Sequence, residues 1–103
     1  MKSFNERCYR ILKKVPMGKV TTYKAIAEKL NSKAYRQVGR AMNKNPHGFL
    51  IGGDVPCHRV VGSNGKLVGF AHGLKKKTEM LKNEGIEIKN GKVDLKKYGF
   101  YFR

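Results

Sequence analysis

Residues 21–44 read TTYKAIAEKLNSKAYRQVGRAMNK and contain two short helical patterns with a break between them. Thr21 or Thr22 can cap the first helix, because a side-chain oxygen there accepts a hydrogen bond from the first turn. The apolar side chains of this helix share one face, at Tyr23, Ile26, Ala27 and Leu30. Asn31-Ser32 breaks the pattern, and Ser32 can cap a second helix that continues to the end of the stretch.

The second helix has two chemically different faces. Its inward stripe consists of Tyr35, Val38 and Met42. Its outward face is basic and polar, with Arg36, Arg40, Asn43 and Lys44. Two short helices joined by a tight turn, the second with a cationic face, are typical of a helix-turn-helix. A solvated face on an ordinary helical bundle is the alternative, and the pattern alone leaves both open.

A first helix and a glycine-rich segment flank this stretch. Ser3 with Glu6 resembles a capping box, and the helix it begins stops at Pro16-Met17-Gly18. Its apolar stripe contains Phe4, Cys8, Ile11, Leu12 and Val15. Because Cys8 lies on that stripe, we interpret it as a buried packing residue. Residues 45–73 are rich in glycine with short apolar runs, which indicates a loop with brief strands.

The C-terminal part predicts a fourth helix and a hairpin. The helix spans about Leu74 to Asn83 and ends at Gly85. Its inward residues are Leu74, Thr78 and Leu81. Asn90-Gly91 is a strong turn signal inside a hairpin that runs from Ile86 to Leu95. The expected cross-strand pairs are Ile88 with Val93 and Ile86 with Leu95. The aromatic ending, residues 98–102, should pack as an edge.

These patterns together predict the fold class. At 103 residues there is room for one domain, residues 1–103, with one modest core. We predict a mainly α fold with small β: a winged-helix-like, three-helix helix-turn-helix domain, a loop, a fourth helix and a C-terminal β-hairpin.

The charge of the chain indicates an anionic partner. It has 23 Lys and Arg against 7 Asp and Glu, a formal net charge of +16. A phosphate backbone is the commonest compensating partner for such an excess, although a lysine-rich surface of the thermophile kind could account for part of it. A membrane partner is not expected, because no segment approaches the ~20 apolar residues of a span and no signal peptide opens the chain.

Cys57 is the candidate nucleophile. It stands beside His58 in Val-Pro-Cys-His-Arg-Val-Val, residues 55–61, and a thiol attacks as its thiolate, which a nearby cation or base makes available. With two cysteines and no export signal, we expect a reduced, cytoplasmic protein. A buried structural cysteine is one alternative. A zinc site is another, but no pair of ligands has the spacing of a structural site, so no metal is predicted.

Four segments occur in an order that resembles a known family. They are Asn45-Pro46, Pro56-Cys57-His58-Arg59-Val60-Val61, Gly69-Phe70 and Asn83-Glu84-Gly85. From about Phe4 to Glu87 the chain resembles the DNA-binding and active-site domain of the O6-alkylguanine-DNA alkyltransferases. The Pro-Cys-His-Arg-Val core is the specific part of the resemblance; the helix-turn-helix alone would not carry it.

The resemblance implies a catalytic role for five residues. Family members flip the damaged guanine out of the duplex and move its O6-alkyl group irreversibly to a cysteine, which matches Cys57. His58 matches the base that activates the thiol through water, and Glu84 matches the carboxylate that orients this histidine. Tyr23 matches the tyrosine that helps to rotate the nucleotide. Asn45 matches the asparagine that ties the helix-turn-helix to the active-site loop.

The resemblance also implies a DNA surface and a substrate pocket. Arg36 matches an arginine that fills the stack vacated by the flipped base, a sensible device because flipping costs a few kcal/mol. The expected DNA contacts are Tyr23, Arg36, Gln37, Arg40, Asn43, Lys44 and Arg59. The expected pocket residues are Tyr23, Val55, Pro56, Phe70, Ala71 and His72.

The chain departs from the family pattern in four ways. We expect the usual N-terminal domain of the family to be absent, and residues 47–54 contain the extra length between Pro46 and Cys57. Phe70-Ala71-His72-Gly73 stands where the family has Tyr-Ser-Gly-Gly, which removes a hydroxyl and adds bulk at the pocket wall. Shortened relatives often carry tryptophan at the acceptor position and only flag lesions, whereas this chain keeps Cys57 and has no tryptophan.

These implications lead to one expected function with alternatives. We expect a single-use DNA repair protein that acts on duplex DNA containing O6-alkylguanine, as a monomer in the cytoplasm near the nucleoid, without a cofactor. The main alternative is a non-catalytic module that binds the lesion and flags it for downstream repair factors. A basic architectural DNA binder without lesion preference is the third reading. In every case DNA binding should weaken steeply with salt.

Overall fold

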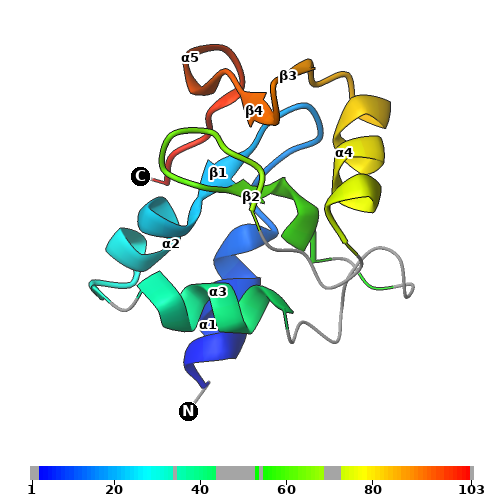
Figure 1. The fold of residues 1–103 in the computed structure, drawn as a ribbon. Helices are drawn as coiled ribbons and strands as arrows, with labels where there is room; N and C mark the ends of the chain where they lie inside the picture. The colour runs from blue at the N-terminus through cyan, green and yellow to red at the C-terminus, as the bar shows by residue number, and fades with distance from the viewer. Residues whose placement is uncertain (1–2, 34, 44–52, 54, 69–72, 103) are drawn as a thin grey trace.

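Three helices at the N-terminal end form the larger part of the core (Figure 1). The computed structural model describes residues 3–33, 35–43, 53, 55–68 and 73–102. Its elements, in order, are α1 (Phe4–Leu12), β1 (Thr21–Thr22), α2 (Tyr23–Lys29), α3 (Tyr35–Asn43), the 3-10 helix η2 (Cys57–Arg59), β2 (Val60–Val61), α4 (Leu74–Asn83), β3 (Ile88–Lys89), β4 (Lys92–Val93) and α5 (Leu95–Tyr98). The mainly helical class with small sheets is confirmed.

Side-chain caps set the beginnings of the first two helices. The Ser3 hydroxyl accepts from the Glu6 backbone N–H at 3.1 Å, and the Thr22 hydroxyl accepts from the Ala25 backbone N–H at 3.0 Å. Both caps were expected, and the structure selects Thr22 of the two threonine candidates. The core between the helices contains Cys8, Leu12, Ile26, Ala27, Val38 and Ala41, all fully buried.

The turn between α2 and α3 differs from its prediction. Asn31 has a left-handed backbone (φ 56°), and the Ser32 backbone N–H bonds back to the Ala27 carbonyl at 2.9 Å. This geometry closes the carboxyl end of α2. The Ser32 backbone therefore takes part in the ending of α2, and α3, described from Tyr35, begins after Lys33 rather than directly after Ser32.

Two residues predicted to face the core are exposed instead. Tyr35 is 42% exposed and Leu74 is 47% exposed. Each is the first residue of its helix, and helical side chains lean toward the N-terminus, so these two extend past the helix end. Val38, Met42 and Leu81 are buried as expected, and Thr78 is half-buried.

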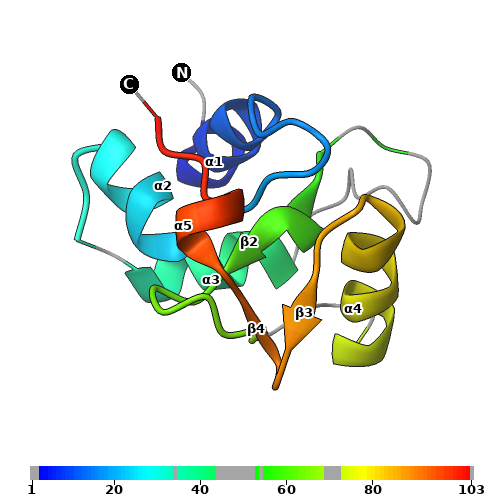
Figure 2. The same cartoon turned by 90° about the horizontal axis from the view of Figure 1, so that it is seen from above.

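A short parallel pairing holds the Cys57 segment against the helices. β1 pairs with β2 in parallel, with Thr21 opposite Val60 and Thr22 opposite Val61. Figure 2 shows α4 on one side of β2 and α2 on the other. Because η2 runs directly into β2, this pairing fixes the Cys57 turn between the three-helix core and α4.

The hairpin is shorter than predicted. Its inner pair, Ile88 opposite Val93, is confirmed. The outer pair, Ile86 with Leu95, is wrong, because the Asp94 side chain accepts from the Lys96 backbone N–H at 2.9 Å and begins α5 at Leu95.

The aromatic ending pairs as an edge, as expected. The Phe100 backbone N–H donates to the Val20 carbonyl at 2.7 Å. The rings of Phe100 and Phe102 meet edge to face, with centroids 5.5 Å apart, and pack against the helical core. Within the described part of the chain, no helix is long and apolar enough to cross a membrane.

Candidate active site

Cys57 lies in a tight turn that follows a proline. The Cys57 backbone N–H donates to the Val55 carbonyl at 2.9 Å, and the Arg59 backbone N–H donates to the Pro56 carbonyl at 2.9 Å. The Cys57 residue is only 7% exposed and belongs to the same core cluster as the first three helices. Val55 and Pro56, expected to line the pocket, are buried directly before it. The thiol is therefore held on a rigid part of the fold.

His58, Arg59 and Glu84 form one buried network beside this turn. His58 Nε2 lies 3.0 Å from Glu84 Oε2. Arg59 Nε donates to Glu84 Oε1 at 2.9 Å, and its Nη2 donates to Oε2 at 2.6 Å. Arg59 Nη1 donates to the Val15 carbonyl at 2.9 Å, which ties the network to the turn that follows α1. The structure thus brings His58 and Glu84 into contact from two distant segments.

The end of α4 explains how Glu84 reaches the histidine. Gly85 has φ 86°, and the Ile86 backbone N–H bonds back to the Leu81 carbonyl at 3.1 Å. This glycine closure ends the helix at the predicted place. Glu84 is the residue between helix and glycine, and the closure leaves its carboxylate facing η2.

Burial and the network shift the pKa values of both partners. Burial alone would raise the pKa of Glu84, but hydrogen bonds from Arg59 and His58 outweigh it and hold the pKa below its usual value. Burial lowers the pKa of His58, although Glu84 opposes this shift. At neutral pH the carboxylate is charged and the imidazole can accept a proton.

These two shifts predict acid sensitivity. The unfolded chain binds more protons than the folded chain as the pH falls through 6.5, the ordinary pKa of His58, because its folded pKa is lower. The free energy of unfolding falls a second time as the pH drops below 4.5, the ordinary pKa of Glu84, because the folded pKa of Glu84 is also lower. We expect the free energy of unfolding, measured with denaturant across this range, to fall in both windows. In a His58→Asn variant, the fall near pH 6.5 should disappear and the fall below pH 4.5 should remain. An unchanged fall near pH 6.5 would contradict its assignment to His58.

Tyr23 also lies near the thiol. Its hydroxyl donates to the Val68 carbonyl at 3.0 Å. Burial raises the pKa of Tyr23 to about 12, and the negative charge of a Cys57 thiolate adds to the shift. Tyr23 therefore keeps its proton and can act as a donor.

Burial raises the pKa of the Cys8 thiol to about 11, which agrees with the predicted packing role of Cys8.

Lys77 is a site residue that the sequence patterns missed. It is fully buried, and its ammonium donates to the Val60 carbonyl at 2.6 Å and the Val68 carbonyl at 3.0 Å. Burial lowers the pKa of Lys77 to about 8, while a Cys57 thiolate opposes this shift. One sequence signal could have indicated its burial: Lys77 stands four residues before Leu81, so the two share the buried face of α4. Lys77 places a positive charge close to Cys57.

The remaining predicted residues divide into three groups. Arg36, Gln37 and Arg40 are exposed on α3, and Asn43 is the last residue of that helix. Lys44, Asn45, Phe70, Ala71 and His72 lie outside the described residues. Arg59, expected to contact DNA, is 6% exposed, and its guanidinium donates to Glu84. Among the residues described, no cluster of three or more His, Cys, Asp or Glu could hold a metal.

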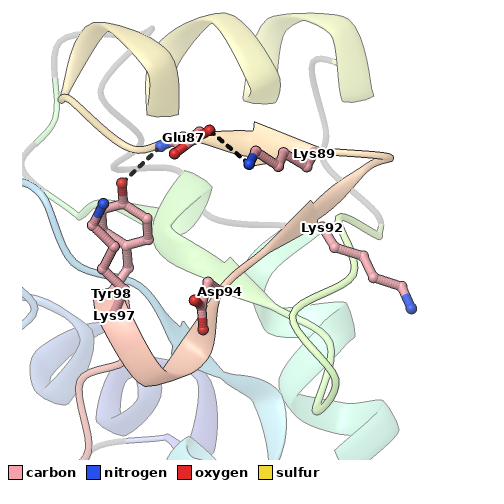
Figure 3. A pocket seen from close by; sticks show the side chains of 6 residues that line it. All are labelled: Glu87, Lys89, Lys92, Asp94, Lys97 and Tyr98. Atoms are coloured by element: carbon pink, nitrogen blue, oxygen red, sulfur yellow. Dashed lines mark hydrogen bonds and ion pairs between the residues drawn. The ribbon is translucent and has the colours of Figure 1, made fainter.

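A separate hollow lies on the C-terminal hairpin (Figure 3). Its volume is about 180 Å³, and its lining residues are Glu87, Lys89, Lys92, Asp94, Lys97 and Tyr98. Glu87 pairs with Lys89 at 3.3 Å, and its backbone N–H donates to the Tyr98 hydroxyl at 3.2 Å. None of these residues belongs to the Cys57 network, so this hollow is distinct from the candidate active site.

The sequence is similar to one family of known proteins. The family model described as 6-O-methylguanine DNA methyltransferase, DNA binding domain, matches residues 3–86. A methylated-DNA--protein-cysteine methyltransferase of Methanosarcina mazei is 45% identical over 84% of this chain and 52% of its own length. The corresponding protein of Methanosarcina acetivorans is 47% identical over 80% of this chain and 51% of its own. The chain spans about half the length of these curated relatives.

Solved structures show the same fold. Schizosaccharomyces pombe Atl1, in complex with damaged DNA containing O6-carboxymethylguanine, has a TM-score of 0.81 and 31% identity, covering 97% of this chain and 98% of that one. The O6-methylguanine-DNA methyltransferase of Pyrococcus kodakaraensis has a TM-score of 0.71 and 37% identity, covering 84% of this chain and 48% of that one.

Proposed function

Because the chain belongs to the 6-O-methylguanine DNA methyltransferase family, we propose that it takes an alkyl group from O6-alkylguanine in duplex DNA onto Cys57. The observation that carries this proposal is the buried His58–Glu84 contact beside the cysteine turn. A histidine held by a carboxylate is the arrangement that nucleophilic catalysis by a thiol requires. The neighbouring ammonium of Lys77 favours the thiolate further.

The proposed transfer balances without a cofactor. His58 takes the thiol proton at Nδ1 through a water, while its Nε2 stays hydrogen-bonded to the Glu84 carboxylate. The sulfur then attacks the alkyl carbon, a carbon–sulfur bond forms, and the bond from that carbon to guanine O6 breaks. The electron pair stays on the guanine, and the resulting anion takes the proton back from His58 through water, so the repaired base remains in its strand. The Tyr23 hydroxyl, which keeps its proton, would turn from the Val68 carbonyl to donate a hydrogen bond to the base during this step.

We propose that α3 binds the duplex. Its exposed arginines and the net charge of +16 suit a phosphate backbone. Arg36 would fill the space left by the extrahelical base, and solved relatives in complex with DNA support a DNA partner for this fold. Tyr23 and Cys57 lie near each other, so a base rotated out of the duplex would meet both.

A second candidate is lesion binding without transfer. One observation favours it: the structure of Atl1 in complex with damaged DNA has a higher TM-score to this chain, 0.81, than the Pyrococcus kodakaraensis methyltransferase, 0.71. Such a module would flag the alkylated base for other repair factors, and Cys57 would then contribute only to packing.

A Cys57→Ser variant separates the two candidates. Each protein is incubated in excess with a duplex that contains one O6-methylguanine, and the DNA is digested to nucleosides. We expect the wild type to convert the lesion to guanine and the variant to bind the duplex but leave the lesion unchanged. Lesion binding by both proteins with no conversion by either would contradict transfer and support the second candidate.

A further inference from the structure

Tyr35 is an exposed aromatic residue at the start of α3. It is 42% exposed, and it directly precedes Arg36. Its ring lines a hollow of about 250 Å³ together with Tyr23, Lys24 and Ser63. It also lines a second hollow of about 350 Å³, with Glu28, Asn31, Ser32 and Lys33. Tyr35 therefore presents its side chain to open space at the N-terminal end of α3, where Arg36 follows it in the chain.

The first of these hollows lies beside the nucleophile. Tyr23 lines the hollow, and its hydroxyl donates a hydrogen bond to the Val68 carbonyl. The negative charge of a Cys57 thiolate interacts with the Tyr23 side chain. Ser63 lies two residues beyond β2, the strand that continues from the cysteine turn. The hollow thus adjoins the Cys57 site through Tyr23 and the first residue of α3 through Tyr35.

We propose that Tyr35 is a stacking residue for the extrahelical alkylguanine nucleotide as it enters the Cys57 site. This role rests on the proposed function. Aromatic side chains stack on the faces of unstacked bases, and Lys24 in the same hollow supplies a positive charge for the adjoining phosphate. Tyr23 and Tyr35 would then contact the nucleotide from two sides of one hollow.

Binding to two duplexes tests this role. All proteins carry Cys57→Ser, so no transfer occurs, and fluorescence anisotropy gives the Kd for a duplex with O6-methylguanine and for one with an abasic site at that position. The lesion preference is the ratio of the two Kd values. Tyr35→Ala and Tyr35→Leu should each reduce it by about tenfold, because the abasic duplex has no base to stack. Tyr35→Phe should keep it, and so should Tyr101→Ala, which removes another exposed tyrosine outside this hollow.

The outcomes separate this role from the proposed function. A full lesion preference in Tyr35→Ala would overturn the stacking role and leave the proposed function standing. An equal preference in Tyr35→Leu and Tyr35→Phe would also overturn it, because bulk rather than an aromatic face would then be sufficient. A parent protein with no lesion preference would overturn the proposed function, and the stacking role with it.

Discussion

Replacing Glu84 by alanine should lower the free energy of unfolding by about 3–5 kcal/mol and abolish transfer. The carboxylate accepts two hydrogen bonds from Arg59 and contacts His58. Without it, a guanidinium that is almost fully buried loses its counterion, and the imidazole loses the group that orients it. Denaturant unfolding measures the first effect, and conversion of O6-methylguanine under folded conditions measures the second.

Glu87→Ala is the matched control for this prediction. Its carboxylate is 56% exposed and pairs with Lys89, which is 79% exposed, so its loss should change stability by less than about 1 kcal/mol. Equal stability losses in the two variants would contradict the buried network. A Glu84→Ala protein that remains folded and transfers at the wild-type rate would contradict the orienting role.

Replacing Lys77 by methionine should slow transfer by about tenfold or more near neutral pH. The ammonium is a buried positive charge that interacts with Cys57, and the thiolate is the nucleophilic form of a cysteine, so loss of the ammonium should disfavour that form and slow the attack. Methionine fills a similar volume without the burial penalty of a charge, so the fold should persist. Single-turnover transfer rates, measured across pH with duplex in excess, give the effect.

The pH profile distinguishes a charge effect from a loss of packing. The rate difference between wild type and Lys77→Met should narrow above pH 8, because the pKa of about 8 means that Lys77 itself loses its proton there. A constant difference at all pH values would indicate a structural effect and contradict the electrostatic role. Lys76→Met is the matched control: this neighbouring side chain is 47% exposed, and its loss should leave the profile unchanged.

Local signals predicted the helices well. The caps at Ser3 and Thr22 and the glycine closure after α4 are interactions within a few residues, so the sequence pattern contains them in full. The errors at Tyr35 and Leu74 have a common cause: a helical stripe was extended to the first residue, where no preceding turn covers the side chain.

Contacts between distant segments were not available from local patterns. The pairing of β1 with β2 and the contact of His58 with Glu84 join residues far apart in the chain, and the family resemblance alone suggested the second. The hydrophobic pattern also excluded Lys77, because it counts only apolar residues as buried. Burial of this lysine depends on two backbone carbonyls near the cysteine turn, which only the fold brings to it.

The most direct test of alkyl transfer is the mass of the Cys57 peptide after reaction. The wild-type protein is incubated with a duplex that carries one O6-methylguanine, digested with a protease and analysed by tandem mass spectrometry. We expect the mass of one methyl group on Cys57, none on Cys8, and none in a parallel sample with undamaged duplex. An unmodified Cys57 peptide from folded protein that is bound to the lesion duplex would contradict the account.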